Sequence, residues 1–568
     1  MSRLIRVALA QINPIVGDVR GNVEKISSII TQAKIKSVDL LAFPELCITG
    51  YPPEDLLKKQ QFVNQNKNAL DTIIQKTEEI CVVVGFVDGK TPLYNAAAVL
   101  QNQSVIGTYH KEKLPNYGVF DEQRYFEAGQ LNQIFNIKDI NIGINICEDI
   151  WYADGPIKKQ KSLGAELIIN INASPYHIDK KSERSSMLKE RALANDLTIA
   201  YVNSVGGQDE LVFDGNSFIV APDGNVIAGC SSFKEELMIA DLQFRDDADL
   251  LEEVNLIEYF NIDENIYNSV NDLKQNMPTI LDDLEEIYQA LVVGTRDYIM
   301  KSGFSKALIG LSGGIDSSLT AAIAVDALGK DNVIGITMPS RYSSEGSVTD
   351  SEILAGNLGI TLLNIPIEDA HKSFERMLND VFIGSEQNIA EENVQSRIRG
   401  NILMTVSNKF GWIVLTTGNK SEMSMGYATL YGDMAGGFCV IKDVSKTMVY
   451  ELSRWKNKQL EFDLIPNAVI NKPPSAELKP NQFDEDSLPP YHILDEIIEL
   501  YLENDSSYED LIERNFPKEM INQVVDAIHR NEYKRNQSPP GVKITPRAYG
   551  KDWRMPIVSK YKNIIHHE

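Results

Sequence analysis

The chain has 568 residues, which is too long for one hydrophobic core and predicts two or three domains. Its hydrophobic content of 43% and charged content of 24% are ordinary for a globular protein. A formal net charge of −25 argues against nucleic-acid binding and against an anionic membrane surface, although a local site for an anionic substrate stays compatible with it.

Residues 1–245 alternate short apolar runs with amphipathic segments and predict an α/β domain. Several runs are apolar almost throughout, which is typical of strands covered on both faces. Asn22 is the expected N-cap of a helix whose apolar face includes Ile26, Ile30 and Ala33. The expected strands are 7–10, 40–43, 81–85, 96–100, 142–146, 167–171 and 200–203.

Residues 246–285 are acidic, and we expect a connector with some helix there. A second α/β domain is expected at 286–568, with strands at 307–310, 333–337 and 412–416 separated by helical patterns. Strand–helix alternation predicts a doubly wound parallel sheet that binds ligands at the carboxyl ends of its strands.

A glycine-rich loop, Leu311-Ser312-Gly313-Gly314-Ile315-Asp316-Ser317-Ser318, joins the first of these strands to a helix. Its backbone N–H groups and the helix dipole favour an anion, and Asp316 adds a carboxylate able to hold Mg²⁺ beside a phosphate. The loop lacks the Gly-Lys-Ser/Thr of a Walker A sequence. It resembles the pyrophosphate loop of N-type ATP pyrophosphatases, and the simpler alternative is an ordinary glycine turn.

Three residues at strand ends of the first domain suggest nucleophilic chemistry: Glu45, Lys111 and Cys147. Taken singly, the cysteine is more often buried and inert, and each charged residue is more often part of a loop. Together with Phe43-Pro44-Glu45-Leu46, Tyr109-His110-Lys111 and Ile146-Cys147-Glu148-Asp149, they resemble the Glu–Lys–Cys triad of the nitrilase superfamily. Lys113 competes for the lysine role, but Tyr109 and Leu114 favour the register on Lys111.

The nitrilase resemblance implies an αββα sandwich that hydrolyses an amide. Cys147 is then the nucleophile, Glu45 the general base, and Lys111 the group that stabilises the oxyanion. Glu122 either orients the lysine or lies at the surface. The residues that look like glutamine contacts are Tyr117, Ser174 and Lys180, although Lys181 competes with Lys180.

Two stretches of the second domain, 417–422 and 426–433, resemble the NAD⁺ synthetase family, as do 338–344, 393–401 and 533–543. The resemblance implies that ATP adenylates deamido-NAD⁺ and that ammonia displaces AMP, with Asp316 and Glu422 holding Mg²⁺. The expected ATP contacts are Gly310, Leu311, Ser312, Gly313, Gly314, Ile315, Asp316, Ser317, Thr417 and Lys446. The expected deamido-NAD⁺ contacts are Asn393, Glu422, Tyr427, Ala428, Thr429, Leu430 and Lys534, with Asp433 a further candidate. Each of these singly is also compatible with a helix cap or a surface ion pair.

The two halves in this order resemble glutamine-dependent NAD⁺ synthetases over nearly the full length. This implies that the chain takes L-glutamine or ammonia as nitrogen donor, forms a homo-oligomer, and passes ammonia internally from Cys147 toward Ser312. One alternative is a glutamine-dependent ligase with another acceptor, and a second is an ammonia-only synthetase with a silent first domain.

Five cysteines lie far apart, with no C-x-x-C pair, so we expect neither a disulfide framework nor a zinc site. A reducing cytoplasm fits this pattern. No stretch reaches transmembrane length, and the first apolar run is too short for a signal peptide. His566 and His567 are expected to be exposed tail residues.

Overall fold

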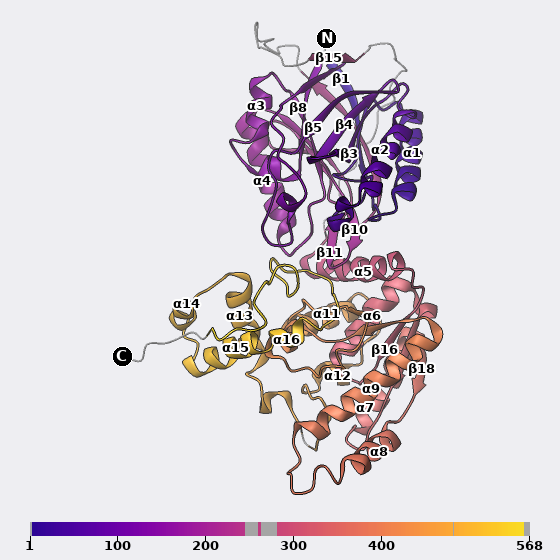
Figure 1. Cartoon of the computed structure of the whole chain (residues 1–568), viewed down its shortest axis with the longest axis vertical. Coiled ribbons are helices and arrows are strands. Elements are labelled where there is room, and N and C mark those ends of the chain that lie inside the picture. Colours follow the sequence, from indigo (N-terminus) through magenta and orange to yellow (C-terminus); the bar gives the residue numbers. More distant parts are fainter. Residues whose placement is uncertain (1–2, 245–258, 263–280, 481, 562–568) are drawn as a thin grey trace. The chain divides into compact units, whose positions relative to one another are not determined.

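The computed structural model describes residues 3–244, 259–262, 281–480 and 482–561 (Figure 1). The chain divides into two compact units, the first of residues 1–208 and 212–281 and the second of residues 209–211 and 282–568. Of the acidic connector predicted at 246–285, only 259–262 and 281–285 are described. His566 and His567 also lie outside the described residues.

The first unit contains two large β-sheets. The six-stranded sheet has the order β14-β1-β2-β3-β4-β5, with bounds Glu236–Phe244, Arg3–Gln11, Leu40–Ala42, Cys81–Gly89, Leu93–Gln101 and Ser104–His110. The seven-stranded sheet has the order β13-β12-β9-β8-β7-β6-β15, with bounds Val226–Gly229, Phe218–Val220, Thr198–Asn203, Leu167–Asn172, Ile140–Ile146, Ile134–Ile137 and Tyr259–Ile262. A separate two-stranded sheet pairs β10 (Val205–Gln208) with β11 (Leu211–Asp214).

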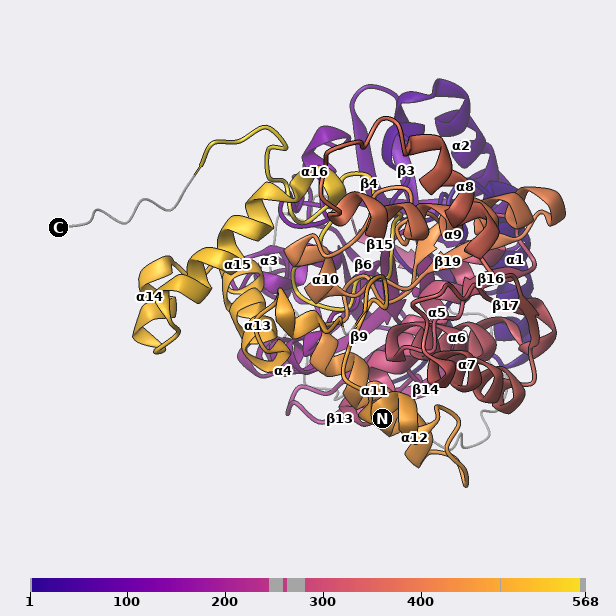
Figure 2. The same ribbon diagram turned by 90° about the horizontal axis from the view of Figure 1, so that it is seen from below.

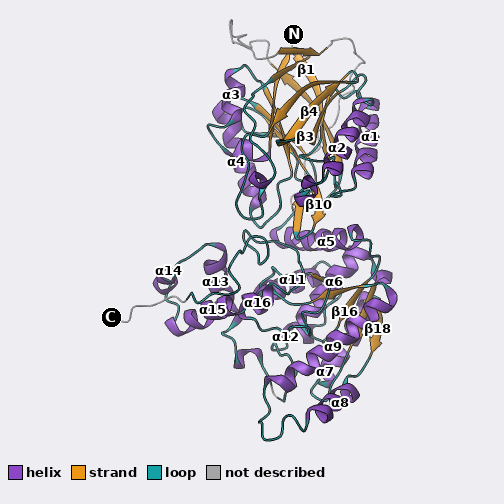
Figure 3. Ribbon diagram, in the orientation of Figure 1, coloured by secondary structure: helices purple, strands orange, loops and turns teal. Residues whose placement is uncertain are grey.

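The two large sheets pack face to face between two helical layers. Alternate residues of β1 point to opposite faces, so Val7 and Leu9 pack between the sheets whereas Ala8 and Ala10 pack with the helices α1 and α2. Helices α3 and α4 cover the outer face of the seven-stranded sheet. The helix bounds are Val19–Ile35 (α1), Gln60–Ile74 (α2), Pro156–Ser162 (α3) and Lys180–Asn195 (α4). The predicted αββα sandwich, with strands apolar on both faces, is confirmed (Figure 3).

The predicted start of α1 is wrong by one turn. Asp18, not Asn22, is the N-cap, because its carboxylate accepts a hydrogen bond from the Gly21 N–H at 3.0 Å. Asn22 lies inside the first turn and is buried, and its amide donates to the carbonyl oxygens of Ile15 and Ile48. A buried asparagine that ties a loop to a helix gives the same local sequence signal as a cap.

The second unit contains a five-stranded sheet of order β18-β17-β16-β19-β20, with bounds Thr361–Asn364, Val333–Thr337, Ala307–Gly310, Ile413–Thr416 and Phe438–Cys439. All four ladders are parallel, as strand–helix alternation predicted. The helices of this part are α5 (Asp283–Lys301), α6 (Ile315–Leu328), α7 (Glu345–Leu358), α8 (Glu368–Leu378), α9 (Ile389–Phe410), α10 (Lys420–Met425), α11 (Lys446–Lys458) and α12 (Asn467–Asn471).

The C-terminal helices have their own apolar core, which includes Leu494, Ile521 and Trp553. Figure 2 shows α13, α14 and α15 grouped on one side of the second unit, away from α6 and α7. The bounds are Tyr491–Ile498 (α13, which continues as a π-helical turn over Glu499–Glu503), Tyr508–Glu513 (α14), Lys518–Arg530 (α15) and Glu532–Arg535 (α16). Within the described ranges, no helix is long and apolar enough to cross a membrane.

Candidate active sites

The first candidate site lies where three strands of the sandwich end. Glu45 follows β2, Lys111 directly follows β5, and Cys147 directly follows β7 and begins the 3₁₀ turn Cys147–Trp151. The exposed fractions of Glu45, Lys111 and Cys147 are 0%, 1% and 4%. The sandwich therefore brings three residues far apart in sequence into a site shielded from water.

Lys111 lies between two carboxylates. Its ammonium is 2.6 Å from Glu45 Oε1 and 2.8 Å from Glu122 Oε1. Glu45 also accepts hydrogen bonds from Asn95 Nδ2 at 2.7 Å and from the Ala173 N–H at 2.9 Å. Glu122 is 4% exposed, so the structure answers the question left open by the sequence: this carboxylate contacts the lysine and is not at the surface.

Burial and charge set the protonation states of this site. Burial and the Glu45 carboxylate raise the pKa of the Cys147 thiol well above its usual value, and the Lys111 ammonium opposes them. Burial alone lowers the pKa of Lys111, but the carboxylates of Glu122 and Glu45 outweigh it and hold that pKa above its ordinary value. Burial raises the pKa of Glu122 to about 7, against the opposing Lys111 ammonium. The resting thiol is therefore protonated, and a thiolate forms only if a neighbouring base takes its proton.

Lys113, the competitor for the lysine role, occupies a different place. Its ammonium lies 5.0 Å from the centre of the Tyr152 ring. Its backbone N–H donates to Asp149 Oδ1 at 2.8 Å, and that carboxylate also accepts the Ile146 N–H, so Asp149 fixes the lysine segment to the cysteine turn.

The three predicted glutamine contacts lie on separate segments of the first unit, and of these Tyr117 interacts with Cys147. Tyr117 donates its hydroxyl to Glu148 Oε2 at 3.0 Å. The hydroxyl oxygen of Ser174, two residues past β8, accepts a long hydrogen bond of 3.4 Å from Arg184 Nη2. Lys180 is the first residue of α4, with its ammonium 4.2 Å from the centre of the Trp151 ring and 3.2 Å from Glu183.

Arg184 and Asn95 were not found from the sequence. Arg184 is 0% exposed, pairs with Asp214 at 3.1 Å, and interacts electrostatically with Cys147. A fully buried arginine in a helix of polar sequence gives no local pattern that marks it. Asn95 lies within β4, and nothing in its sequence neighbourhood indicates that its amide faces Glu45.

The second candidate site begins at the glycine-rich loop after β16. Gly313 adopts a φ of +74°, and a Cβ there would lie 2.3 Å from the Ser347 carbonyl oxygen, so only glycine fits. Gly314 is the N-cap residue of α6, which turns the first N–H groups of that helix toward the loop. The hydroxyls of Ser317 and Ser318 donate to the Gly314 carbonyl, so in this structure they brace the turn.

Four polar side chains meet beside this loop. Asp316 accepts a hydrogen bond from Asn419 Nδ2 at 2.8 Å and pairs with Lys446 at 2.5 Å. The same ammonium lies 3.6 Å from Glu422 Oε1. Burial and the Asp316 carboxylate raise the pKa of Glu422 to about 8, against the Lys446 ammonium. Thr417 lies one residue past the end of β19, at the same edge of the sheet.

The donor set of this cluster fits a divalent cation. Two half-buried carboxylates, Asp316 and Glu422, share one ammonium, which leaves one negative charge uncompensated when both are ionised. Carboxylate oxygens are the ligands that Mg²⁺ prefers, commonly one or two from the protein with phosphate oxygens beside them. Among the described residues, no group of three or more His, Cys, Asp or Glu side chains could hold a metal by itself. Such an ion would complete its coordination with water or substrate oxygens.

A third group of predicted residues lies near the C-terminus of α10. Thr429 Oγ1 donates to Asn393 Oδ1 at 2.7 Å, and the Thr429 N–H donates to Asp433. Lys534 donates to the carbonyl oxygens of Gly426 and Ala428, which brings the C-terminal segment to the 426–433 stretch. Burial raises the pKa of Asp433 to about 6. Leu430 is partly buried and packs against the C-terminal apolar core.

Asp484 interacts with both the Asp316–Lys446 cluster and the 426–433 stretch, and it was not identified from the sequence. It is 4% exposed, accepts the Tyr491 hydroxyl at 2.9 Å, and interacts with Tyr427, Lys446 and Asp316. The sequence places it in a loop rich in acidic residues, where one buried carboxylate looks like its exposed neighbours.

Two family profiles match the chain, one for each unit. Residues 6–248 match the carbon-nitrogen hydrolase family, and residues 287–538 match the NAD synthase family. A glutamine-dependent NAD(+) synthetase from Thermotoga maritima is 47% identical over 581 residues, covering 99% of this chain and 100% of the relative. This chain belongs to the glutamine-dependent NAD(+) synthetase family. A relative of the same name from Aquifex aeolicus is 45% identical, covering 98% of this chain and 100% of that one.

Solved structures of glutamine-dependent NAD(+) synthetases have the same architecture. The protein from Acinetobacter baumannii, in complex with ADP, is 41% identical, has a TM-score of 0.75, and is matched over 98% of both chains. The protein from Cytophaga hutchinsonii is 23% identical with a TM-score of 0.81 over 98% of both chains, which supports the fold. The family predicted from the motifs at Cys147, at Ser312 and at 417–433 is thus confirmed.

Proposed function

We propose that this chain converts deamido-NAD⁺ to NAD⁺ with ATP, using ammonia that its first unit releases from L-glutamine. One observation carries the proposal: in a chain related to these synthetases over its full length, Glu45, Lys111 and Glu122 meet in one buried cluster that interacts with the Cys147 thiol. An inert first unit has no need of two carboxylates and an ammonium buried beside a cysteine.

The first unit supplies the nitrogen. Glu45 accepts the Cys147 proton as the sulfur attacks the side-chain amide carbon, and Lys111 stabilises the oxyanion that develops on the amide oxygen. Glu45 returns the proton to the leaving nitrogen, so ammonia departs and a thioester remains. Water then attacks the thioester carbon, with Glu45 as base, and glutamate leaves with the thiol restored. Tyr117, Ser174 and Lys180 are proposed to bind the rest of the glutamine.

The second unit consumes the ammonia. The nicotinate carboxylate of deamido-NAD⁺ attacks the α-phosphorus of ATP, which forms an acyl adenylate and releases pyrophosphate. Ammonia attacks the acyl carbon, and AMP leaves as the amide forms. The loop 310–317, Thr417 and Lys446 are proposed to bind ATP, because N–H groups at a helix N-terminus and a buried ammonium suit phosphates. Asn393, Glu422, the 427–430 stretch and Lys534 are proposed to bind deamido-NAD⁺.

Mg²⁺ is the proposed cofactor of this site. When bound, it would neutralise phosphate charge and act as a Lewis acid. Asp316 and Glu422 are the residues proposed to hold it. If this is correct, EDTA abolishes NAD⁺ formation and leaves glutamine hydrolysis intact.

Three further expectations stay proposals. The domain limits 1–245 and 286–568, with a connector at 246–285, are supported by family matches at 6–248 and 287–538. A reducing cytoplasm is supported by five cysteines that are all free and buried. A homo-oligomer is implied by the family and is tested by light scattering of the purified protein.

The test is an assay of NAD⁺ formation by the full chain from deamido-NAD⁺ and ATP, with glutamine or with ammonium chloride. We expect NAD⁺, AMP and pyrophosphate in equal amounts with either donor, and glutamate only with glutamine. Consumption of ATP with another carboxylate or a nucleotide base, and not with deamido-NAD⁺, would show a ligase of different specificity. Formation of NAD⁺ with ammonium chloride but not with glutamine would show that the first unit is catalytically silent.

A further inference from the structure

The mechanism does not use Lys420, yet this side chain is among the most buried of the second unit. Lys420 is the first residue of α10 and is 2% exposed. A cation at a helix N-terminus is electrostatically unfavourable, and a buried ammonium is costly unless it is fully paired. Both the helix N-terminus and the burial oppose a charge at this position, which indicates that the ammonium has a role there.

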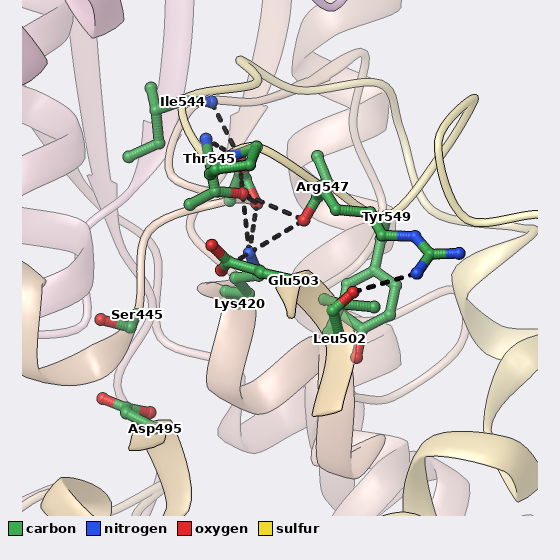
Figure 4. Close-up of polar contacts among 12 residues, drawn as sticks. Lys420, Ser445, Asp495, Leu502, Glu503, Ile544, Thr545, Arg547 and Tyr549 are labelled. Carbon is green, nitrogen blue, oxygen red and sulfur yellow. Dashed lines mark hydrogen bonds and ion pairs between the residues drawn. The ribbon is translucent and has the colours of Figure 1, made fainter. Parts of the chain in front are cut away.

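The ammonium of Lys420 joins three separate parts of the chain (Figure 4). It lies 2.9 Å from Asp443 in the segment after β20, 2.5 Å from Glu503 in the π-helical turn after α13, and 2.8 Å from Thr545 Oγ1 in the C-terminal segment. It also donates to the Arg547 carbonyl oxygen at 3.2 Å. The carboxylates of Asp443 and Glu503 outweigh burial and hold the pKa of Lys420 above its ordinary value.

The C-terminal segment is attached through the same cluster. Asp443 Oδ2 accepts the N–H groups of Ile544 and Thr545, each at 2.8 Å, and the Thr545 hydroxyl also donates to Asp443. Asp443 is 3% exposed. Lys420 and Asp443 together therefore tie residues 544–547 to the first turn of α10.

The opposite side of that turn faces the proposed ATP site. Asn419, the N-cap of α10, donates to Asp316 at 2.8 Å and accepts the Glu422 N–H at 2.9 Å. Glu422 reaches toward Lys446. The Lys420 N–H donates to the Val444 carbonyl at 2.8 Å, so the backbone and the side chain of one residue both hold the turn. This attachment therefore restrains Asn419 and Glu422, which lie on either side of Lys420 in the chain.

We propose that Lys420 is a positioning residue of the synthetase reaction: by pairing with Asp443, Glu503 and Thr545, it fixes the first turn of α10 and so aims Asn419 and Glu422 at Asp316 and Lys446. It contacts no substrate. The C-terminal segment around Thr545 thereby becomes part of the support of the active site. This inference rests on the function proposed above.

The experiment compares Lys420→Met with the parent in ammonium-driven NAD⁺ formation, glutamine hydrolysis and amide hydrogen exchange. We expect kcat for NAD⁺ formation to fall roughly 10- to 100-fold, as for other residues that orient active-site groups. The KM for ATP should change less than kcat, because Lys420 acts on the loop 310–317 only through Asn419 and Asp316, while the hydroxyls of Ser317 and Ser318 brace the turn itself. Peptides covering 417–425 should exchange faster while those covering α6 do not, and glutamine hydrolysis should be unchanged.

Two variants separate positioning from simple loss of stability. Lys420→Arg keeps the charge and should recover part of kcat. Leu511→Ala removes a buried side chain of the C-terminal apolar core on α14, where Leu511 is 0% exposed, and should lower the melting temperature without the kcat loss or the local exchange. Equal loss of kcat in Leu511→Ala at matched stability would overturn the proposal, as would a folded Lys420→Met that keeps kcat.

Thr545→Val covers the case in which Lys420→Met does not fold. This variant keeps the ammonium and both carboxylates and removes one hydroxyl. We therefore expect a smaller loss of kcat and a smaller increase of exchange over 417–425 than in Lys420→Met. Unchanged kcat and unchanged exchange over 417–425 in this variant would overturn the proposal. Failure of the proposed function is distinguishable, because the parent then forms no NAD⁺, whereas the exchange comparison still reports whether Lys420 fixes α10.

Discussion

The ammonium of Lys111 lies 2.6 Å from the carboxylate of Glu45, and both side chains are shielded from solvent. In the proposed mechanism the same ammonium stabilises the oxyanion that develops on the substrate while Glu45 takes and returns a proton. The pair therefore places the groups for both events of amide cleavage side by side.

Replacing Cys147 by alanine should separate the two activities. Without the sulfur nucleophile no thioester forms, so glutamine-driven NAD⁺ formation and glutamate release should fall to background. Ammonium-driven NAD⁺ formation should continue at the parent rate. Cys230→Ala is the matched control, since Cys230 is also free and buried in the first unit, and both activities should survive it. Loss of ammonium-driven synthesis in Cys147→Ala would contradict the assignment of the two reactions to separate sites.

Glutamine hydrolysis should rise with pH through about 7, the pKa to which burial raises Glu122. Below that pH Glu122 is protonated and no longer holds the Lys111 ammonium as a charge partner, and above it the carboxylate is ionised. In Glu122→Gln this limb of the kcat/KM profile should disappear and the rate should stay low at every pH. Glu112→Gln, at a carboxylate that pairs with Lys159, is the control and should keep the parent profile. An unchanged limb in Glu122→Gln would assign it to another group.

Substituting Lys180 by methionine should raise the KM for glutamine about 10- to 100-fold, the usual effect of removing one charge-assisted hydrogen bond. The kcat should change much less, because the substrate carboxylate lies away from the reacting amide. Lys181→Met is the comparison that decides between the neighbouring lysines. The larger rise of KM in Lys181→Met would move the role to that residue.

Asp316→Asn and Glu422→Gln should each lower ammonium-driven NAD⁺ formation by about 100-fold or more, as loss of a group that stabilises transition-state charge does. Glutamate release should be unaffected, because these residues belong to the second unit. Glu451→Gln replaces an exposed glutamate on α11 and should leave both rates unchanged. Retained synthesis in Glu422→Gln would remove Glu422 from the proposed cation site.

An ammonia-trapping enzyme in the assay tests internal transfer of ammonia. We expect it to suppress ammonium-driven synthesis and to spare most glutamine-driven synthesis, because neutral ammonia that never reaches the solvent is not trapped. Complete loss of glutamine-driven synthesis in the presence of the trap would mean that ammonia leaves the protein before it reacts.

Local sequence patterns predicted the α/β class of both units, and the resemblance of the Glu45, Lys111 and Cys147 motifs to the nitrilase superfamily added the αββα arrangement of the first. A continuous apolar run predicts a covered strand, and the glycine-rich loop before Asp316 predicts a strand–turn–helix. Contacts between distant residues have no such signal. The pairing of Arg184 with Asp214, the amide of Asn95 on Glu45, and the burial of Asp484 and Lys420 all arise from packing between segments. The prediction that Asn22 caps α1 was wrong for the same reason. Its side chain bonds to the distant Ile48 carbonyl, and the local sequence does not distinguish such an asparagine from a helix cap.

The contacts that hold Glu45 bear on when the newly made chain becomes active. Its carboxylate accepts the N–H of Ala173, which is 128 residues further along the chain, and β14 closes the six-stranded sheet by pairing with β1. Glu45 therefore acquires its full set of contacts only after the chain has been synthesised past Ala173, and the sheet beside it is complete only once β14 has been made. If Glu45 is the general base, we expect a chain truncated before β14 to lack glutamine hydrolysis even though it carries Cys147.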